Sequence, residues 1–124
     1  MIDRIDHLVL TVADIPATVS FYKRALEFEA VEKDGRWSLK FGQQKINLHQ
    51  VGHTFDPKAA RPTPGSSDLC FIAAVPLEVV QQRFAIAGIE VVEGPVSRNG
   101  ALGPMKSIYF RDPDGNLVEV AQYA

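Results

Sequence analysis

The chain has 124 residues, of which 46% are hydrophobic and 23% charged, and its formal net charge is −2. This composition is typical of a globular protein, and the length fits one domain or two small halves that share a core. No Lys/Arg-rich run and no apolar stretch of membrane-spanning length occurs, so we expect neither a nucleic acid nor a membrane as partner. The single cysteine, Cys70, excludes an internal disulfide, and the first residues lack the layout of a secretory signal, which favours a cytoplasmic location.

The first half of the chain predicts one strand, one helix and three further strands. Residues 5–12 form a β-rich run, and Asp14 and Pro16 then have the positions expected at the start of a helix. Apolar residues recur at helical spacing from Ile15 to Leu26, which indicates an amphipathic helix. The three strands that follow are predicted at residues 28–33, 37–41 and 46–51.

The same order of elements returns after a Pro- and Gly-rich stretch. A strand is predicted at residues 68–74 and a helix at residues 77–87, with Gly88 at its C-terminal stop. Residues 94–104 are rich in Gly and Pro and are predicted to be a loop, and Asp112-Pro113-Asp114-Gly115 is predicted to be a turn. The remaining strands are predicted at residues 89–93, 106–110 and 116–121.

The pattern is therefore β-α-β-β-β twice, which predicts an α+β fold of two tandem modules that form a curved mixed sheet. The modules are expected at residues 1–52 and 68–124, joined by a connector at residues 53–67, within a single domain. A connector of this length without periodicity is often mobile or lies over a site. His53, in this connector, is expected to be solvent-exposed, and Cys70 is expected to be a small core hydrophobe.

Superposing the two modules by hand places His7 over Asp68 and His49 over Glu119. Because side chains alternate along a strand, His7 faces the same side as Val9, while Asn47 shares the face of His49 and is its polar rival. If a pseudo-twofold axis relates the modules, the four superposed positions converge. Two imidazoles and a carboxylate suit Fe(II), Mn(II), Ni(II), Co(II) or Zn(II) and leave positions open for water or substrate.

The stretches "IDHLVLTV", "FYKRAL" and "FRDPDGNLVEV" resemble those of the vicinal-oxygen-chelate superfamily of glyoxalase I, fosfomycin-resistance enzymes, bleomycin-resistance proteins and extradiol dioxygenases. The resemblance covers essentially the whole chain and is greatest to small glyoxalase-domain-containing proteins. It implies metal ligands at His7, His49 and Glu119. The family often places His or Glu where this chain has Asp68, which leaves the coordination number open, and Glu27 stands where relatives usually have Gly.

The resemblance further implies a metal-dependent enzyme that acts on a small substrate with two neighbouring oxygens, such as the hemithioacetal of methylglyoxal and a thiol. A metal acting as a Lewis acid would stabilise the oxyanion that develops. A carboxylate would move the proton, with Glu119 as the first candidate base and Asp68 as the second. The candidate substrate-binding residues are Arg98, Lys106, Tyr109 and Trp37.

Two other functions remain open from the sequence. An extradiol Fe(II) dioxygenase would use His7, His49 and Glu119 as a two-His, one-carboxylate triad. A bleomycin-resistance-like protein would sequester a ligand without metal and without turnover.

Because an open sheet leaves edges to be covered, we expect a homodimer, in which the metal ligands of one site come from one chain or from two.

Overall fold

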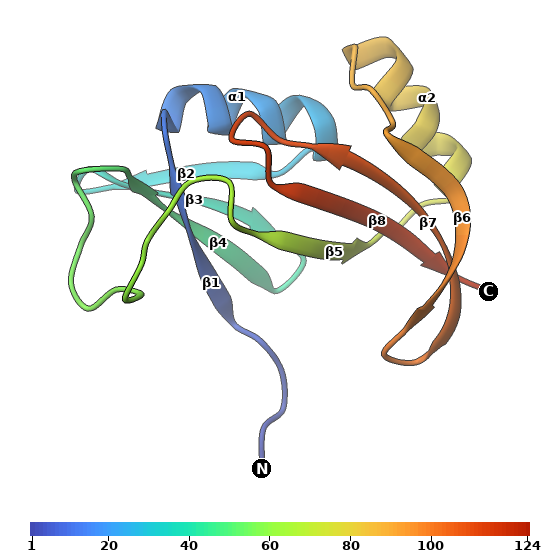
Figure 1. Ribbon diagram of the computed structural model, residues 1–124, viewed down its shortest axis with the longest axis horizontal. Helices are drawn as coiled ribbons and strands as arrows, with labels where there is room; N and C mark the ends of the chain where they lie inside the picture. Colours follow the sequence, from blue (N-terminus) through green and yellow to red (C-terminus); the bar gives the residue numbers. More distant parts are fainter. The chain divides into compact units, whose positions relative to one another are not determined.

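The computed structural model describes all 124 residues and divides the chain into two compact units, Met1–Ser66 and Ser67–Ala124. Each unit contains one α-helix and one four-stranded mixed sheet, and the helix lies over one face of its own sheet (Figure 1).

The first unit contains a sheet that we call sheet A, with the strand order β1-β4-β3-β2. Strand β1 runs parallel to β4, and the other neighbours are antiparallel. The elements of this unit are β1 (His7–Val12), α1 (Ile15–Leu26), β2 (Glu29–Lys33), β3 (Arg36–Phe41) and β4 (Gln44–Gln50).

The second unit repeats this topology in a sheet that we call sheet B, with the order β5-β8-β7-β6 and the parallel pair β5 and β8. The prediction of two tandem βαβββ modules is therefore confirmed. The elements of this unit are β5 (Asp68–Ile72), α2 (Leu77–Ala87), β6 (Glu93–Gly100), β7 (Gly103–Arg111) and β8 (Leu117–Tyr123).

The predicted loop at residues 94–104 and the predicted strand at residues 89–93 are wrong. Strand β6 begins at Glu93 and pairs antiparallel with β7 along most of the predicted loop. The glycines that suggested a loop have a packing role, because a Cβ on Gly94 would collide with the Ser107 carbonyl and one on Gly100 would collide with the Tyr123 ring. Strand glycines of this kind mark a close approach of neighbouring chains.

Helix α1 begins and ends where its sequence predicts. The carboxylate of Asp14 accepts a hydrogen bond from the Ala17 amide at 3.2 Å, which satisfies a free amide of the first turn. At the other end Glu27 adopts a left-handed conformation with φ = 58°, the geometry that glycine adopts most easily at a helix C-terminus. The buried face of α1 packs against the apolar face of sheet A, where Tyr22, Leu39 and Ile46 are fully buried.

The second unit has its own core between α2 and sheet B. Phe84 and Phe110 are buried there with their ring centroids 4.8 Å apart. The turn before β8 is confirmed as a structural element, because the buried carboxylate of Asp112 accepts hydrogen bonds from the amides of Asp114 and Asn116. The turn chemistry seen in the sequence therefore supports the fold.

A pair of glutamines shows that the modules are true structural repeats. The side chain of Gln50, at the end of β4, accepts a hydrogen bond from the amide of Ile15 at 3.0 Å. Gln122, near the end of β8, accepts one from the amide of Leu77, also at 3.0 Å. Ile15 and Leu77 are the first residues of their helices, so each module uses a glutamine from its last strand to satisfy a free helix amide.

No helix of the protein is both long enough and apolar enough to cross a membrane. Residues 54–67 contain no helix or strand, and within this stretch Phe55 contacts the side chains of His49 and Arg36 on sheet A.

Candidate metal centre

Each sheet has one face that packs against its helix and one face that does not. We call the second the open face. On sheet A the alternation of buried and exposed positions places His7, Val9 and Thr11 of β1 on the open face, beside Asn47 and His49 of β4. On sheet B the same alternation places Asp68, Cys70, Tyr109 and Glu119 on the open face.

His7 is held in an orientation suited to a metal ligand. Its side chain is 46% exposed, and its Nδ1 lies 2.8 Å from Oδ2 of Asp6. This hydrogen bond also lowers the pKa of Asp6 below its ordinary value. A carboxylate bound to one ring nitrogen leaves the other nitrogen free, as is usual for metal-bound histidines. The sequence signal for Asp6 is its place directly before the histidine in "IDH", and the sequence reasoning missed it.

His49 has a different environment. Its Nδ1 is buried and has no hydrogen-bond partner, and its ring lies edge-on to Phe55 with the centroids 5.4 Å apart. Burial lowers the pKa of His49, and the positive charges of Arg36 and Lys58 lower it further. The imidazole is therefore neutral at pH 7, which is the form that binds a metal or accepts a proton.

The strand registers correct the superposition of the modules. His7 lies opposite Lys45, and Asp68 lies opposite Leu117. In module 1 the residue two positions beyond Lys45 is Asn47, and in module 2 the residue two positions beyond Leu117 is Glu119. Glu119 is therefore matched by Asn47 and not by His49, so the superposition was wrong by two residues.

His7 and His49 are also separated along the strands. Because His7 lies opposite Lys45 and Thr11 lies opposite His49, four residues separate the two positions, or about 13 Å at the usual strand rise. Asn47 is the polar residue of β4 nearer to His7. Neither unit by itself brings together three or more His, Cys, Asp or Glu side chains in an arrangement that could hold a metal ion.

Glu119 lies between two hydrogen-bonding neighbours on sheet B. Cys70 and Tyr109 are its register partners on the two adjacent strands, and the thiol and the hydroxyl both form hydrogen bonds with the Glu119 carboxylate. The Oε2 atom of Glu119 is nevertheless buried without a hydrogen-bond partner. A buried carboxylate oxygen in this state has a strong need for a donor or a cation.

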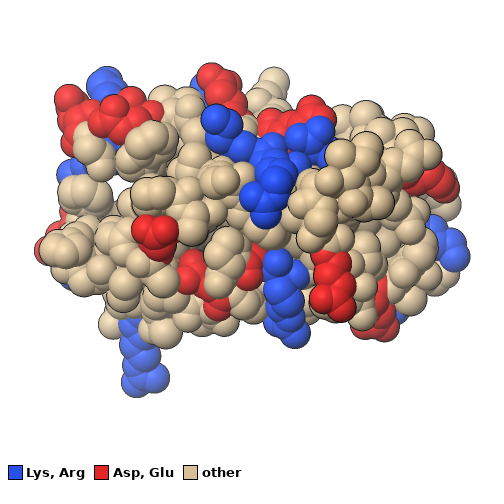
Figure 2. All heavy atoms as spheres, turned by 90° about the horizontal axis from the view of Figure 1, so that it is seen from above, with Lys and Arg blue, Asp and Glu red and all other residues tan.

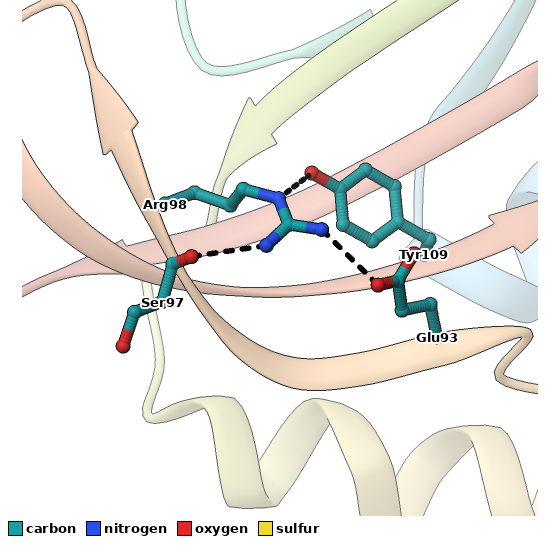
Figure 3. Close-up of polar contacts among 4 residues, drawn as sticks. All are labelled: Glu93, Ser97, Arg98 and Tyr109. Atoms are coloured by element: carbon teal, nitrogen blue, oxygen red, sulfur yellow. Dashed lines mark hydrogen bonds and ion pairs between the residues drawn. The ribbon is translucent and has the colours of Figure 1, made fainter.

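The hydroxyl of Tyr109 is held by Arg98, which also pairs with Glu93 (Figure 3). The hydroxyl accepts a hydrogen bond from Nε of Arg98 at 2.9 Å, and the same guanidinium lies 3.2 Å from Oε1 of Glu93. Partial burial and the charge of Glu119 raise the pKa of Tyr109, although Arg98 opposes this shift. Tyr109 is therefore a neutral phenol at pH 7 that accepts from Arg98 and donates to Glu119.

Cys70 is not a core residue, contrary to the expectation from the sequence. It is exposed on the open face of sheet B. Partial burial of the thiol, together with the charge of Glu119 and the hydrogen bond to it, raises the pKa of Cys70 to about 11. The thiol is therefore protonated at neutral pH and acts as a hydrogen-bond donor rather than as a nucleophile.

Three other candidate residues have the following positions. Asp68 is exposed two residues before Cys70 and shares its face. Lys106 precedes the open-face residue Ser107 on β7, so its side chain points to the opposite face of the sheet. Its ammonium donates a hydrogen bond to the hydroxyl of Ser97 at 3.0 Å. Trp37 borders two cavities, one over the open face of sheet A and a smaller one beside α1.

Each open face carries a donor of a type that divalent metals accept. His7 offers an imidazole nitrogen supported by a carboxylate, and Glu119 offers a buried oxygen without a partner. Nitrogen and carboxylate oxygen are ligands that Zn(II), Fe(II), Co(II), Ni(II) and Mn(II) share.

A family model described as the Glyoxalase/Bleomycin resistance protein/Dioxygenase superfamily matches residues 4–120. The chain belongs to this superfamily. It is 60% identical over 124 residues to the virulence protein STM3117 of Salmonella typhimurium, with 99% of this chain and 86% of that protein covered. The crystal structure of STM3117 has a TM-score of 0.97 to this chain at 58% identity and covers 100% of this chain and 99% of its own.

Two other proteins similar to this chain have names that state a chemistry. The metallothiol transferase FosB of Shouchella clausii is 32% identical, with 97% of this chain and 80% of that protein covered. The crystal structure of a lactoylglutathione lyase from Agrobacterium tumefaciens has a TM-score of 0.75 at 26% identity, with 98% and 95% of the two chains covered.

Proposed function

We propose that this superfamily member is a divalent-metal-dependent enzyme acting on a small substrate with two neighbouring oxygen atoms. The favoured reaction is a glyoxalase I-like isomerisation of a hemithioacetal formed from methylglyoxal and a thiol. The metallothiol transferase and the lactoylglutathione lyase among its relatives support a metal and a thiol adduct, respectively.

The observation that carries the proposal is the buried Oε2 of Glu119, which has no hydrogen-bond partner. Tyr109 and Cys70 hold the carboxylate in place, and His7 has the Asp6 support expected of a metal ligand. His7 and Glu119 are therefore the first two proposed ligands. The sequence predicts His49 as the third ligand, but His49 lies about 13 Å from His7 along the strands, so Asn47 is the better placed of the two.

A bound divalent ion would polarise the two substrate oxygens as a Lewis acid. The protein residues have separate tasks. Tyr109, kept neutral, holds a proton near Glu119 and keeps that carboxylate oriented. Glu119 is the first candidate to move a proton between neighbouring substrate carbons, and the exposed carboxylate of Asp68 is the second.

His7 and Glu119 belong to different units, so the proposed centre uses both modules. The modules come from one chain or from two copies in a homodimer, which is the assembly that we propose. Mixing a His7→Ala chain with a Glu119→Gln chain distinguishes these cases. Metal binding restored in the mixture, to about a quarter or more of the wild-type level, would indicate ligands from two chains.

The experiment that tests the proposed metal centre is a metal assay on untagged protein incubated with Ni(II), Co(II), Zn(II), Mn(II) or Fe(II). We expect near-stoichiometric binding of at least one ion and its loss in His7→Ala. His53→Ala is the matched control, because His53 is an exposed histidine of the connector. Absence of binding with every ion, or equal loss in both variants, would contradict the centre and favour a metal-free, ligand-sequestering protein.

The reaction is tested by a turnover screen on the metal-loaded protein. Hemithioacetals of methylglyoxal with several thiols test the isomerase, and catechols under air with Fe(II) test the extradiol dioxygenase. We expect isomerase activity that is lost in Glu119→Gln. Ring cleavage of a catechol without isomerase activity would instead support the dioxygenase.

A further inference from the structure

The open face of sheet A carries an unusual set of basic residues around a large cavity. The cavity has a volume of about 1040 Å³ and is lined by Lys33, Arg36, Lys40 and Lys45, among others. None of these four cations forms an ion pair with a carboxylate. On the face of the molecule that Figure 2 shows, by contrast, acidic and basic side chains are interspersed.

The strand registers arrange these cations in two rows. Lys40 lies directly opposite Lys45, and Lys33 lies directly opposite Arg36. Like charges opposite each other on neighbouring strands destabilise a sheet unless something compensates them. The cations of each row therefore repel each other in the free protein, less so at Lys40 because Glu29 lies on its other side, and a bound anion would lower this repulsion further.

Between the two rows lies a third row of uncharged side chains, Val31, Ser38 and Asn47. Ser38 is opposite Val31 on one side and opposite Asn47 on the other. Neither Ser38 nor Asn47 has a side-chain hydrogen bond within the protein, although both line the cavity. A hydroxyl and an amide that are free to donate, with cations on both sides, form a suitable floor for an anionic oxygen group.

The acidic residues near this face neutralise it only in part. Asp6 is hydrogen-bonded to His7 and interacts electrostatically with Lys45, although it forms no ion pair with that lysine. Asp34 lies at the turn between β2 and β3 and borders the same cavity. Glu29 lies opposite Lys40, beyond the cavity, and does not form an ion pair with it.

One wall of the cavity is aromatic. Phe55 lies beneath the guanidinium of Arg36, 4.0 Å from ring centroid to Cζ, and contacts His49 edge-on. The ring covers part of the buried imidazole and offers an apolar surface beside the basic rows. A ligand that fits this cavity therefore has an anionic head and an apolar body.

We propose that the open face of sheet A binds a small organic anion, with a carboxylate or phosphate group on Ser38 and Asn47 between the basic rows and the apolar part against Phe55. The inference depends on the proposed function only in that it assigns this charge to the substrate. Binding of the anion itself requires no metal.

Isothermal titration calorimetry on the full chain tests this proposal with three probes: benzoate, phenyl phosphate and the neutral benzyl alcohol. We expect one or both anions to bind and the alcohol not to bind. The variant Lys40→Gln/Lys45→Gln is expected to raise the dissociation constant of the anion about tenfold. Trp37, the single tryptophan, borders the cavity and provides a second readout by fluorescence.

The matched control is Lys23→Gln/Arg24→Gln, which removes two positive charges from helix α1 on the other side of the sheet and is expected to leave binding unchanged. Binding of only one anion would support the proposal and identify the head group. The absence of binding heat with both anions up to about 10 mM would overturn it, because a dissociation constant above that concentration means negligible binding. Equal binding of benzyl alcohol, or equal weakening by the control variant, would also overturn it. Repeating the titration after chelation separates this site from the metal centre.

Discussion

The two modules share a scaffold but differ in the chemistry of their open faces. Leu39 and Phe110 hold matched, fully buried positions beneath the two helices, and Gln50 and Gln122 cap those helices in the same way. The open face of module 1 carries two rows of unpaired cations. That of module 2 centres on Glu119, at a position where module 1 has Asn47.

This difference shows where a duplicated fold is free to change. The residues that face the helices must fill a core, so their size and polarity are restricted in both copies. Residues on the open faces have no such restriction, and one copy has become basic while the other holds a carboxylate among neutral donors. Scaffold substitutions should therefore act alike in the two modules, whereas open-face substitutions should not.

The largest effect is expected from the matched core positions. Leu39→Ala and Phe110→Ala each remove a fully buried side chain, and each should lower the free energy of unfolding by about 3 kcal/mol or more. Urea unfolding followed by circular dichroism measures both changes. Val9→Ala on the open face, where Val9 is 46% exposed, is the control and should cost less than about 1 kcal/mol. A large loss for one core variant and none for the other would break the equivalence of the scaffolds.

A second prediction concerns the matched pair Glu119 and Asn47. Glu119→Asn gives module 2 the residue of module 1 and should weaken metal binding by about a hundredfold, because a charged ligand is replaced by an amide. Asn47→Ala should weaken metal binding more than His49→Ala, because His49 lies about 13 Å from His7 along the strands and Asn47 lies nearer. A large loss in His49→Ala together with no loss in Asn47→Ala would instead keep His49 in the centre. Metal titration by calorimetry measures all three variants.

A smaller and symmetric effect is expected from the glutamines that cap the helices. Gln50→Ala and Gln122→Ala each leave a helix amide without its acceptor and should cost about 1 kcal/mol of stability. Replacement of Gln122 by Glu keeps the acceptor oxygen and should cost less, whereas Gln50→Glu also loses the amide that donates to the Ala13 carbonyl and should cost as much as Gln50→Ala. Urea unfolding of the four variants measures these free energies. A loss of stability confined to one module would show that the glutamine-to-helix hydrogen bond is not equivalent in the two copies.

The smallest expected effect concerns the thiol of Cys70 in chelator-treated protein. With a pKa of about 11, the thiol is almost entirely protonated at pH 8 and should react slowly with iodoacetamide, with a rate that rises steeply above pH 10. Glu119→Gln removes a charge that raises this pKa, so the pKa should fall and the rate at pH 8 should increase severalfold. Because the chain has one cysteine, mass spectrometry reports this site alone. A wild-type midpoint near 9 would contradict the assigned environment.

Much of the fold could be predicted because its signals are local. Apolar periodicity defined α1 and α2, and Asp14 and Gly88 marked a helix start and a helix end. The hairpin of β6 and β7 was missed because Gly94 and Gly100 are also typical of loops. The reason for these glycines is tertiary: Ser107 lies against Gly94 and Tyr123 lies against Gly100, and neither contact is visible in the local sequence.

The site could be predicted only in part. Alternation along the strands identifies which residues share the open face, but a shift of two residues preserves that face and leaves no trace in the pattern. The sequence therefore matched His49 with Glu119, whereas the strand registers match Asn47 with Glu119. The basic rows were also missed, because Lys40 and Lys45 become neighbours only when β3 and β4 pair.

The central claim is that His7 and Glu119 bind one divalent ion. Anomalous diffraction from crystals loaded with Co(II) or Zn(II) tests it most directly. We predict a strong peak about 2.0–2.2 Å from a ring nitrogen of His7 and from a carboxylate oxygen of Glu119, contributed by one chain or by two. A fully occupied ion bound by neither side chain would contradict the account.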